Sequence, residues 1–319
     1  MNRCLWHVCL IALLAPPVVA ADFPTKPIRV IVPWPAGGST DTIGRIVAQR
    51  LTIISGQQVV IDNRPGAGGA IGAAIASKAS PDGYTLTIVE ASHVVMPATT
   101  AGLGYDLARD FAPLTLVGIS PQILFIHASL PAKSVADFVA AAKAKPGLVP
   151  AAHTGIGSFT HLMTEMFQMR IGVKFNQVSY KGAAPAFIDL GSGQVHIYMA
   201  TLASGAGMLR TGRVRAIAVA SEKRIAALPE VPTLAEVGIP DMVVLQWWGY
   251  VAPARVPGAI QSRLHKDLVA AIDDASVRER VTELAVDVST STPAHLKAHI
   301  ADELQRWAVV ARSAGLKPE

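Results

Sequence analysis

The chain has 319 residues, of which 51% are hydrophobic and 16% charged, and its formal net charge at pH 7 is +5. Its basic residues are spread without a basic block, which argues against nucleic-acid binding and gives only a weak hint of anionic ligands. Both cysteines, Cys4 and Cys9, lie in the N-terminal segment. Removal of that segment would exclude disulfides, thiolate metal sites and cysteine catalysis.

The N-terminal segment, residues 1–21, is typical of a secretory signal peptide. Arg3 precedes an apolar run at residues 5–14, and the small residues Ala20 and Ala21 follow. This run is about ten residues long, well below the roughly 20 that a membrane-spanning helix needs. Neither cysteine lies where a lipoprotein carries its acylated residue. We expect cleavage after Ala20 or Ala21 and a free periplasmic protein, with an uncleaved anchor as the alternative.

The remaining chain is long enough for two lobes of roughly 100 to 150 residues, and its first part alternates strands and helices. A β-branched run at residues 28–32 leads through a glycine-rich loop into a helix with apolar residues at helical spacing, residues 43–51. A strand at 59–61 completes a βαβ unit. A second glycine-rich loop at 64–69 opens an alanine-rich helix before the strand at 84–89. This alternation predicts a doubly wound, mostly parallel sheet.

The same pattern restarts near residue 114 and predicts a second α/β lobe. Strands are expected at residues 114–117, 123–126, 148–152, 173–178, 194–198 and 214–220. Helices are expected at residues 134–143, 159–170 and 185–190.

Beyond a proline-dotted stretch at residues 229–240, a strand at 243–251 is followed only by helices, at residues 257–272, 275–284, 293–299 and 301–314. These helices need a sheet to cover, so the chain is expected to return to the first lobe. Crossings near residues 122 and 250 would form a hinge. Lobe 1 would then comprise residues 22–122 plus 251–319, and lobe 2 residues 123–250.

Two glycine-rich loops each feed a helix, which makes them candidate anion sites, because a helix N-terminus carries unpaired amides and partial positive charge. Facing each other across a cleft, they could hold the two ends of a dicarboxylate with neutral donors and make closure ligand-dependent. The alternative is that each loop is simply a turn that caps a helix. The candidate residues are Ala36, Gly37, Gly38, Ser39, Thr40 and Asp41 in the first loop, and Thr154, Gly155, Gly157 and Ser158 in the second.

Other polar candidates lie near predicted strand ends, where ligands of α/β proteins commonly bind. They are Ser92, His93, His161 and Lys181. A lone histidine is more often a hydrogen-bonded structural residue, and a lysine a solvated one. Trp34 could wall the pocket or pack in the core. The glycines at 66–69 are predicted to be structural, since small residues allow close helix packing, and no nucleotide-binding motif is complete.

Three segments, at residues 33–41, 63–69 and 80–86, closely resemble the Bug-type receptors of tripartite tricarboxylate transporters. Shorter matches follow in family order at residues 180–182, 228–233, 306–308 and 314–318. The resemblance implies a type II periplasmic binding protein that closes on dicarboxylates, acidic amino acids or aromatic carboxylates, and membrane permease subunits as partners. It also implies that the first loop grips one carboxylate through backbone amides and ordered water, while residues 154–158 receive the other end.

The chain departs from this family pattern near its candidate site. Relatives commonly carry an aspartate after the segment that corresponds to residues 193–195, and here the corresponding residue is taken to be Ala200. A ligand ammonium would then lack one counter-charge, which disfavours amino acids. Glu90 and His93 stand where relatives often carry small residues, and either could read a hydroxyl or an amine.

The sequence therefore predicts a non-catalytic, monomeric receptor without cofactor or metal, which binds a small organic carboxylate and delivers it to permease subunits. An accessory receptor that reports to a sensor would have the same cleft. A periplasmic hydrolase is the less favoured alternative, because neither a G-x-S-x-G nor an H-E-x-x-H motif occurs.

Overall fold

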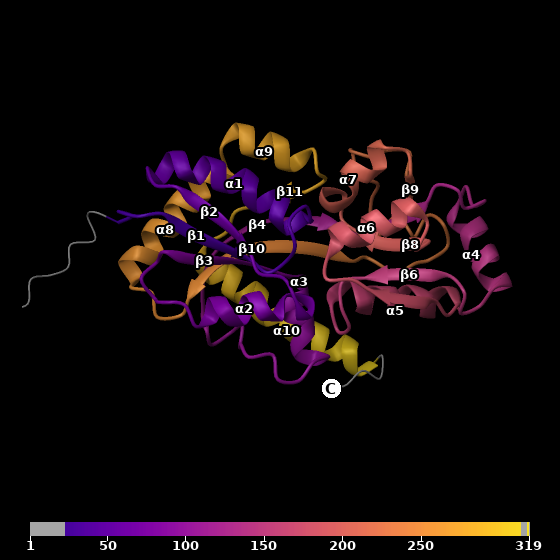
Figure 1. Cartoon of the computed structure of the whole chain (residues 1–319), viewed down its shortest axis with the longest axis horizontal. Coiled ribbons are helices and arrows are strands. Elements are labelled where there is room, and N and C mark those ends of the chain that lie inside the picture. Colours follow the sequence, from indigo (N-terminus) through magenta and orange to yellow (C-terminus); the bar gives the residue numbers. More distant parts are fainter. Residues whose placement is uncertain (1–22, 314–317, 319) are drawn as a thin grey trace, which may run out of the picture.

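The structure is a computed structural model that describes residues 23–313 and residue 318, so the predicted signal peptide lies outside the described residues. The chain forms two α/β lobes side by side along its long axis (Figure 1). The first sheet has the order β11-β4-β10-β3-β1-β2 and the second the order β7-β6-β8-β5-β9. The two-lobed α/β prediction is confirmed.

The strands are β1 (Ile28–Val32), β2 (Val59–Asn63), β3 (Thr85–Glu90), β4 (Phe111–Pro121), β5 (Ile123–His127), β6 (Pro150–His153), β7 (Asn176–Ser179), β8 (Ile197–Ala200), β9 (Val214–Val219), β10 (Leu245–Pro253) and β11 (Asp287–Val288).

Both sheets consist mostly of parallel strands. In the first sheet β1, β2, β3 and β4 run in one direction, while β10 and β11 run against them. In the second sheet β6, β7, β8 and β9 share a direction and β5 opposes them. The opposing strands β5 and β10 adjoin the two crossings between lobes.

The two crossings lie side by side and are hydrogen-bonded to one another. Gln122 donates its amide to the carbonyl of Val244 at 3.1 Å, and Val244 donates its amide to the carbonyl of Ala220 at 2.9 Å. The predicted division at residue 250 is wrong, because it falls inside β10, which pairs with β4 along its whole length. The chain returns to the first sheet at Leu245, where β10 begins. Two adjacent, extended linkers of this kind are the usual construction of a hinge.

Helices cover both faces of the first sheet (Figure 1). On one face lie α1 (Ser39–Ser55), α8 (Gly258–Ile272) and α9 (Ala275–Thr282), and on the other α2 (Ala70–Ser77), α3 (Ala91–Val95) and α10 (Pro293–Ser313). Two helices were predicted where α10 is continuous, because the sequence break was placed at Ile300. That residue is buried against the core and no glycine or proline interrupts the helix there.

The second lobe carries α4 (Val135–Ala144), α5 (Phe159–Ile171), α6 (Ala183–Ser192) and α7 (Leu202–Arg210). Helix α7 was not predicted, because Gly205 and Gly207 lower its intrinsic helix propensity. Gly205 is required by packing, since a Cβ there would lie 2.7 Å from the ring of Phe187. Tertiary contacts therefore override local propensity in this helix.

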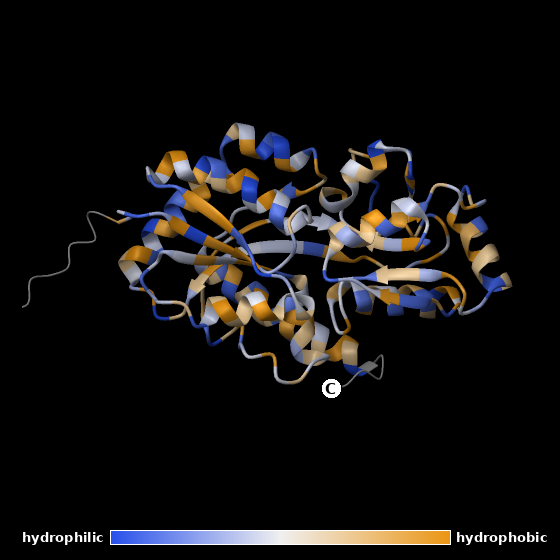
Figure 2. Cartoon of the chain, in the orientation of Figure 1, coloured by the Kyte–Doolittle hydropathy of each residue, from blue (hydrophilic) through white to orange (hydrophobic). Residues whose placement is uncertain are grey.

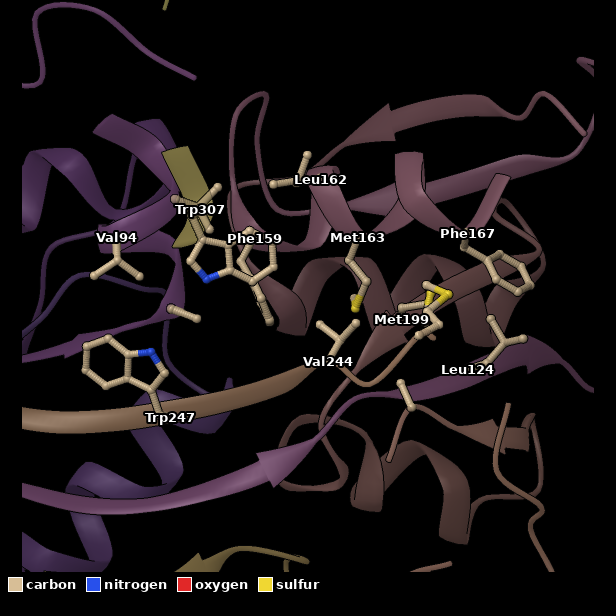
Figure 3. Close-up of a cluster of buried hydrophobic side chains, with 14 of the residues drawn as sticks. Val94, Leu124, Phe159, Leu162, Met163, Phe167, Met199, Val244, Trp247 and Trp307 are labelled. Atoms are coloured by element: carbon tan, nitrogen blue, oxygen red, sulfur yellow. The ribbon is translucent and has the colours of Figure 1, made fainter. Parts of the chain in front are cut away.

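An apolar core joins the two lobes along the side of α10. Trp307 of α10 meets Phe159 of α5 edge-on, with ring centroids 5.4 Å apart, and both side chains are buried. Figure 3 shows Val94 and Trp247 of the first lobe continuing into Met163 and other side chains of the second. Hydrophobic and hydrophilic residues alternate along the helices (Figure 2), as in helices that pack one face on a sheet. No helix among the described residues has the length and apolar character needed to cross a membrane.

Candidate functional site

A small pocket with a volume of about 40 Å³ lies between the lobes beside the hinge. The first lobe and the hinge contribute Trp34, Gly38, Ser39, Thr40, Glu90, Ser92, Gln122 and Gln246, and the second lobe contributes Thr154, Phe159, Thr160, Ala183, Tyr198, Ala200, Thr201 and Ser204.

Neutral hydrogen-bonding groups dominate the pocket. Seven of its lining residues are serines or threonines, drawn from both lobes. Among the described residues that line it there is one carboxyl group, that of Glu90, and no lysine, arginine or histidine. An anion in this pocket would therefore be held by hydroxyls and backbone amides.

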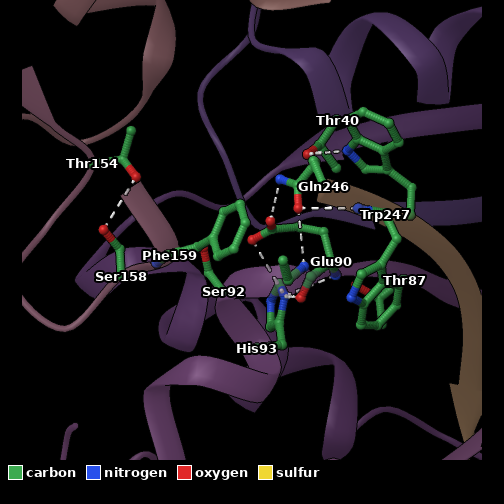
Figure 4. Close-up of polar contacts among 12 residues, drawn as sticks. Thr40, Thr87, Glu90, Ser92, His93, Thr154, Ser158, Phe159, Gln246 and Trp247 are labelled. Atoms are coloured by element: carbon green, nitrogen blue, oxygen red, sulfur yellow. Dashed lines mark hydrogen bonds and ion pairs between the residues drawn. The ribbon is translucent and has the colours of Figure 1, made fainter. Parts of the chain in front are cut away.

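The N-terminus of α1 opens into the pocket. Its N-cap is Gly38, which has an extended backbone (φ −81°, ψ 173°) and no side chain to cap the first-turn amides. Ser39 donates its amide across the cleft to Ser204 Oγ at 3.0 Å. Thr40 is fixed from behind, because Trp248 Nε1 donates to its hydroxyl at 3.2 Å in the buried core (Figure 4). The helix thus presents amides and hydroxyls in a preformed arrangement.

Asp41 holds this loop in shape from outside the pocket. Its carboxylate accepts hydrogen bonds from the Gly37 amide and from Asn63 Nδ2, both at 2.9 Å, and pairs with Arg45. Burial works to raise the pKa of Asp41, but these hydrogen bonds outweigh it and lower the pKa below its usual value. Ala36 and Gly37 are exposed. Of the predicted first-loop residues, Gly38, Ser39 and Thr40 line the pocket, while Ala36, Gly37 and Asp41 do not.

The second loop contributes Thr154 to the pocket, but its other predicted residues serve the helix or the opposite lobe. Ser158 caps α5 by accepting the His161 amide at 3.3 Å, and it also contacts the Thr154 hydroxyl (Figure 4). The carbonyl of Gly157 accepts a hydrogen bond from Thr99 of the first lobe at 2.8 Å.

Gly155 lies against Gly68 of the first lobe, because a Cβ on Gly155 would be 3.4 Å from the Gly68 backbone. The glycine cluster at residues 66–69 therefore meets the second lobe across the cleft. Gly72, just beyond it, allows close packing, since a Cβ there would lie 2.7 Å from the backbone of Pro33. These glycines serve packing and lobe contact.

The two predicted histidines lie behind the pocket wall. His93 is fully buried, and its Nδ1 accepts the Glu90 amide at 3.1 Å. Burial lowers the pKa of His93 to about 4, so the ring is neutral at pH 7. The Nδ1 of His161 accepts the Gly157 amide at 3.2 Å, and burial lowers its pKa as well. Lys181 is exposed and does not line the pocket.

Glu90, which the sequence indicates could read a hydroxyl or an amine, lines the pocket, and so does Gln246, which is not among the predicted residues. Gln246 donates its side-chain amide to Glu90 Oε2 at 2.5 Å in the buried wall (Figure 4). Desolvation raises the pKa of Glu90 to about 7, against hydrogen bonds from Gln246 and Ser92 that lower it. A usable signal was the position of Glu90 at the carboxyl end of a parallel strand, the edge where ligands bind in such sheets.

Comparison with known proteins gives a consistent relationship over nearly the whole chain. The family model described as "Tripartite tricarboxylate transporter family receptor" matches residues 43–316. Protein BugT of Bordetella pertussis is 37% identical over 306 residues, covering 95% of this chain and 94% of BugT. The periplasmic binding protein BugD superposes with a TM-score of 0.90 at 31% identity, covering 93% of this chain and 100% of BugD. The R. palustris protein Rpa4515, solved with adipate, gives a TM-score of 0.90 at 34% identity and covers 93% of this chain and 100% of its own.

Proposed function

Because the chain belongs to the tripartite tricarboxylate transporter receptor family, we propose that it captures a small organic carboxylate in the pocket between its lobes and delivers it, unchanged, to membrane permease subunits. The protein works as a monomer in the periplasm after removal of its signal peptide. The observation that carries the proposal is an α1 N-terminus, capped by a glycine, that faces a pocket lined by both lobes.

One carboxylate of the ligand binds at the N-terminus of α1. Gly38 lets the ligand approach the backbone, and the Thr40 amide with the hydroxyls of Ser39 and Thr40 supplies neutral donors next to the positive end of the helix dipole. Thr154 and Thr160 offer hydroxyls from the second lobe. A ligand that bridges these groups stabilises the closed form, because it contacts both lobes only when they are together.

The remaining wall sets the shape of the ligand. Trp34 and Phe159 supply aromatic surface, while Ala200 and Ala183 are small and leave space. Ser92 adds a hydroxyl that also accepts the Phe159 amide of the opposite lobe at 3.4 Å. In support of the ligand class, the similar protein Rpa4515 was solved with adipate.

A thermal-shift screen of the mature protein tests this function. The panel contains aliphatic dicarboxylates, tricarboxylates, aromatic carboxylates and acidic amino acids. A ligand that binds only the folded state raises stability by about 2.7 kcal/mol at a hundredfold excess over its dissociation constant. We expect a clear shift with one class of acid, and recovery of that compound unchanged after incubation. Absence of a shift with every acid would contradict the carboxylate site, and conversion of the compound would contradict the receptor role.

A further inference from the structure

We propose that Glu90 and Gln122 form a specificity subsite that accepts a hydrogen bond from the ligand, so that the preferred acid carries an amino or hydroxyl group besides its carboxylate. This inference rests on the proposed function and narrows its ligand. The two side chains line the same pocket, and each is about 1% exposed.

Gln246 determines which carboxyl oxygen of Glu90 is bonded inside the pocket wall. The Oε1 atom of Gln246 accepts the amides of Ala91 and Trp247, both at 3.2 Å. Its amide nitrogen is therefore the atom that faces Glu90, and it donates to Oε2 at 2.5 Å. One carboxyl oxygen of Glu90 is thus committed as an acceptor inside the wall. Ser92 and the Trp34 indole also approach the carboxylate and lower its pKa, but neither reaches Oε1 with hydrogen-bond geometry.

Two buried oxygen atoms at the pocket have no hydrogen-bond partner within the described part of the chain. They are Glu90 Oε1 and Gln122 Oε1. Most buried polar atoms in proteins are paired, and an unpaired one costs about 1–3 kcal/mol. The backbone of Gln122 is fixed beside the pocket by hinge hydrogen bonds to Val244 and Ala220. Both oxygens would be satisfied by a donor group on the ligand.

The charges around Glu90 also favour a ligand that donates a hydrogen bond to it. The titratable groups nearest to it are His93 of α3, whose Nδ1 lies 3.7 Å from Glu90 Oε1, and the tyrosines Tyr105 and Tyr198. His93 carries no charge at pH 7, because burial lowers its pKa to about 4. A ligand amine would supply the counter-charge that ionised Glu90 lacks, and a hydroxyl would supply a donor without charge.

This subsite revises the expectation drawn from Ala200. On sequence alone, the absence of a carboxylate at this position disfavours amino acids. In the structure the pocket does contain a carboxylate, supplied by Glu90 from the first lobe. Ala200 lines the same pocket from the opposite lobe.

The test uses isothermal titration of the mature protein with acids that differ in one group. The main series is succinate, malate and aspartate, with adipate and 2-aminoadipate as a longer pair and benzoate, 4-hydroxybenzoate and 4-aminobenzoate as an aromatic series. At pH 8 we expect at least one amino- or hydroxyl-bearing acid to bind roughly tenfold or more tightly than its parent, as for a hydrogen bond to a charged group.

The variant Glu90→Gln should reverse this preference. Because Gln246 still requires an acceptor, the oxygen of the new amide takes the inner position and its NH₂ faces the pocket. Donor-bearing acids then lose at least tenfold in affinity, while the unsubstituted parent keeps or gains affinity. Glu165→Gln is the matched control, since Glu165 also contacts glutamine side chains but lies outside the pocket.

Lowering the pH separates an amine from a hydroxyl. The pKa of Glu90 is raised to about 7 by burial, so binding of an ammonium below that pH must release a proton and the affinity falls. Hydroxy acids keep their affinity between pH 6 and 8. If unsubstituted acids bind as tightly as their amino and hydroxy partners in the native protein, or if Glu90→Gln leaves the ratios unchanged, the subsite is refuted while the receptor function stands. If no acid of any series binds, the proposed function itself fails.

Discussion

The loops before α1 and α5 both carry the chain from a strand into a helix at the cleft, yet they cap their helices differently. The first loop ends in Gly38, which offers no side chain to the helix amides. The second ends in Ser158, whose hydroxyl accepts the amide of His161. An amide that is already bonded within its own helix is less available to a ligand.

The two loops also differ in what holds them. Asp41 holds the first loop from within its own lobe, while the helix end that faces the pocket contacts the second lobe through the bond from the Ser39 amide to Ser204 Oγ. The second loop touches the opposite lobe, through the bond from Thr99 to the Gly157 carbonyl and the contact of Gly155 with Gly68. We infer that the first loop binds the ligand, and that the second loop chiefly forms contacts between the lobes in the closed form.

The largest effect is expected from Gly38→Leu. The backbone of Gly38 is in a region that any residue adopts, so the change adds bulk without backbone strain. A Cβ there would point toward Ala183 of the other lobe at 3.9 Å, and a longer side chain would fill the space in front of the helix amides. We expect affinity for the best acid of the screen to fall by at least 100-fold in titration calorimetry, with the melting temperature of the ligand-free protein nearly unchanged.

Gly38→Ala is the matched control for that variant. Its Cβ makes only ordinary contacts, at 3.8 Å to the Pro35 carbonyl and 3.9 Å to Ala183. The loss of affinity should be tenfold at most. Retained affinity in Gly38→Leu would remove the first loop from the binding site and break the contrast with the second.

An intermediate effect is expected from Gly157→Ala, which obstructs the contact between lobes. Gly157 has a positive φ of 75°, and a Cβ would lie 2.5 Å from Thr100 Oγ1 and 2.8 Å from Thr99 Oγ1. Closure should become harder, so affinity falls roughly tenfold, because the closed state must be populated for tight binding. Titration calorimetry measures the loss.

Thr100→Ala removes the atom nearest to that added Cβ and should restore part of the affinity in the double variant. The coupling between the two substitutions, measured in a double-mutant cycle, identifies the lobe contact as the cause. If the double variant recovers nothing, the contact with Thr100 is not the cause, and the loss comes from the remaining contact with Thr99 or from backbone strain at Gly157.

Much of this arrangement could be predicted from the sequence, because it depends on local patterns. Periodicity and turns predict β1, α1 and α5, and the glycines of the loop before α1 indicate the helix end that lines the pocket. The roles of the second loop could not be predicted. Whether Ser158 faces a ligand or caps its own helix depends on which lobe packs against it, and that is decided by contacts far apart in the chain.

The same limit explains why Gln246 was missed as a partner of Glu90. The two residues are far apart in sequence, and they meet because β10 returns from the second lobe and pairs with β3. The boundary predicted at residue 250 had assigned most of β10 to the other lobe. A buried strand has the same hydrophobic pattern whichever sheet it joins, so periodicity cannot show which of the two lobes β10 belongs to.

The smallest effect on affinity is expected from Ser158→Ala. This change removes the side-chain cap of α5, which typically costs about 1 kcal/mol of folding stability. Urea denaturation should show this loss. Titration calorimetry should show affinity within about threefold of the native protein, because Ser158 is fully buried behind Thr154 and does not line the pocket. If affinity instead falls as far as in Gly38→Leu, the second loop contacts the ligand as directly as the first, and the assignment of binding to one loop and closure to the other is wrong.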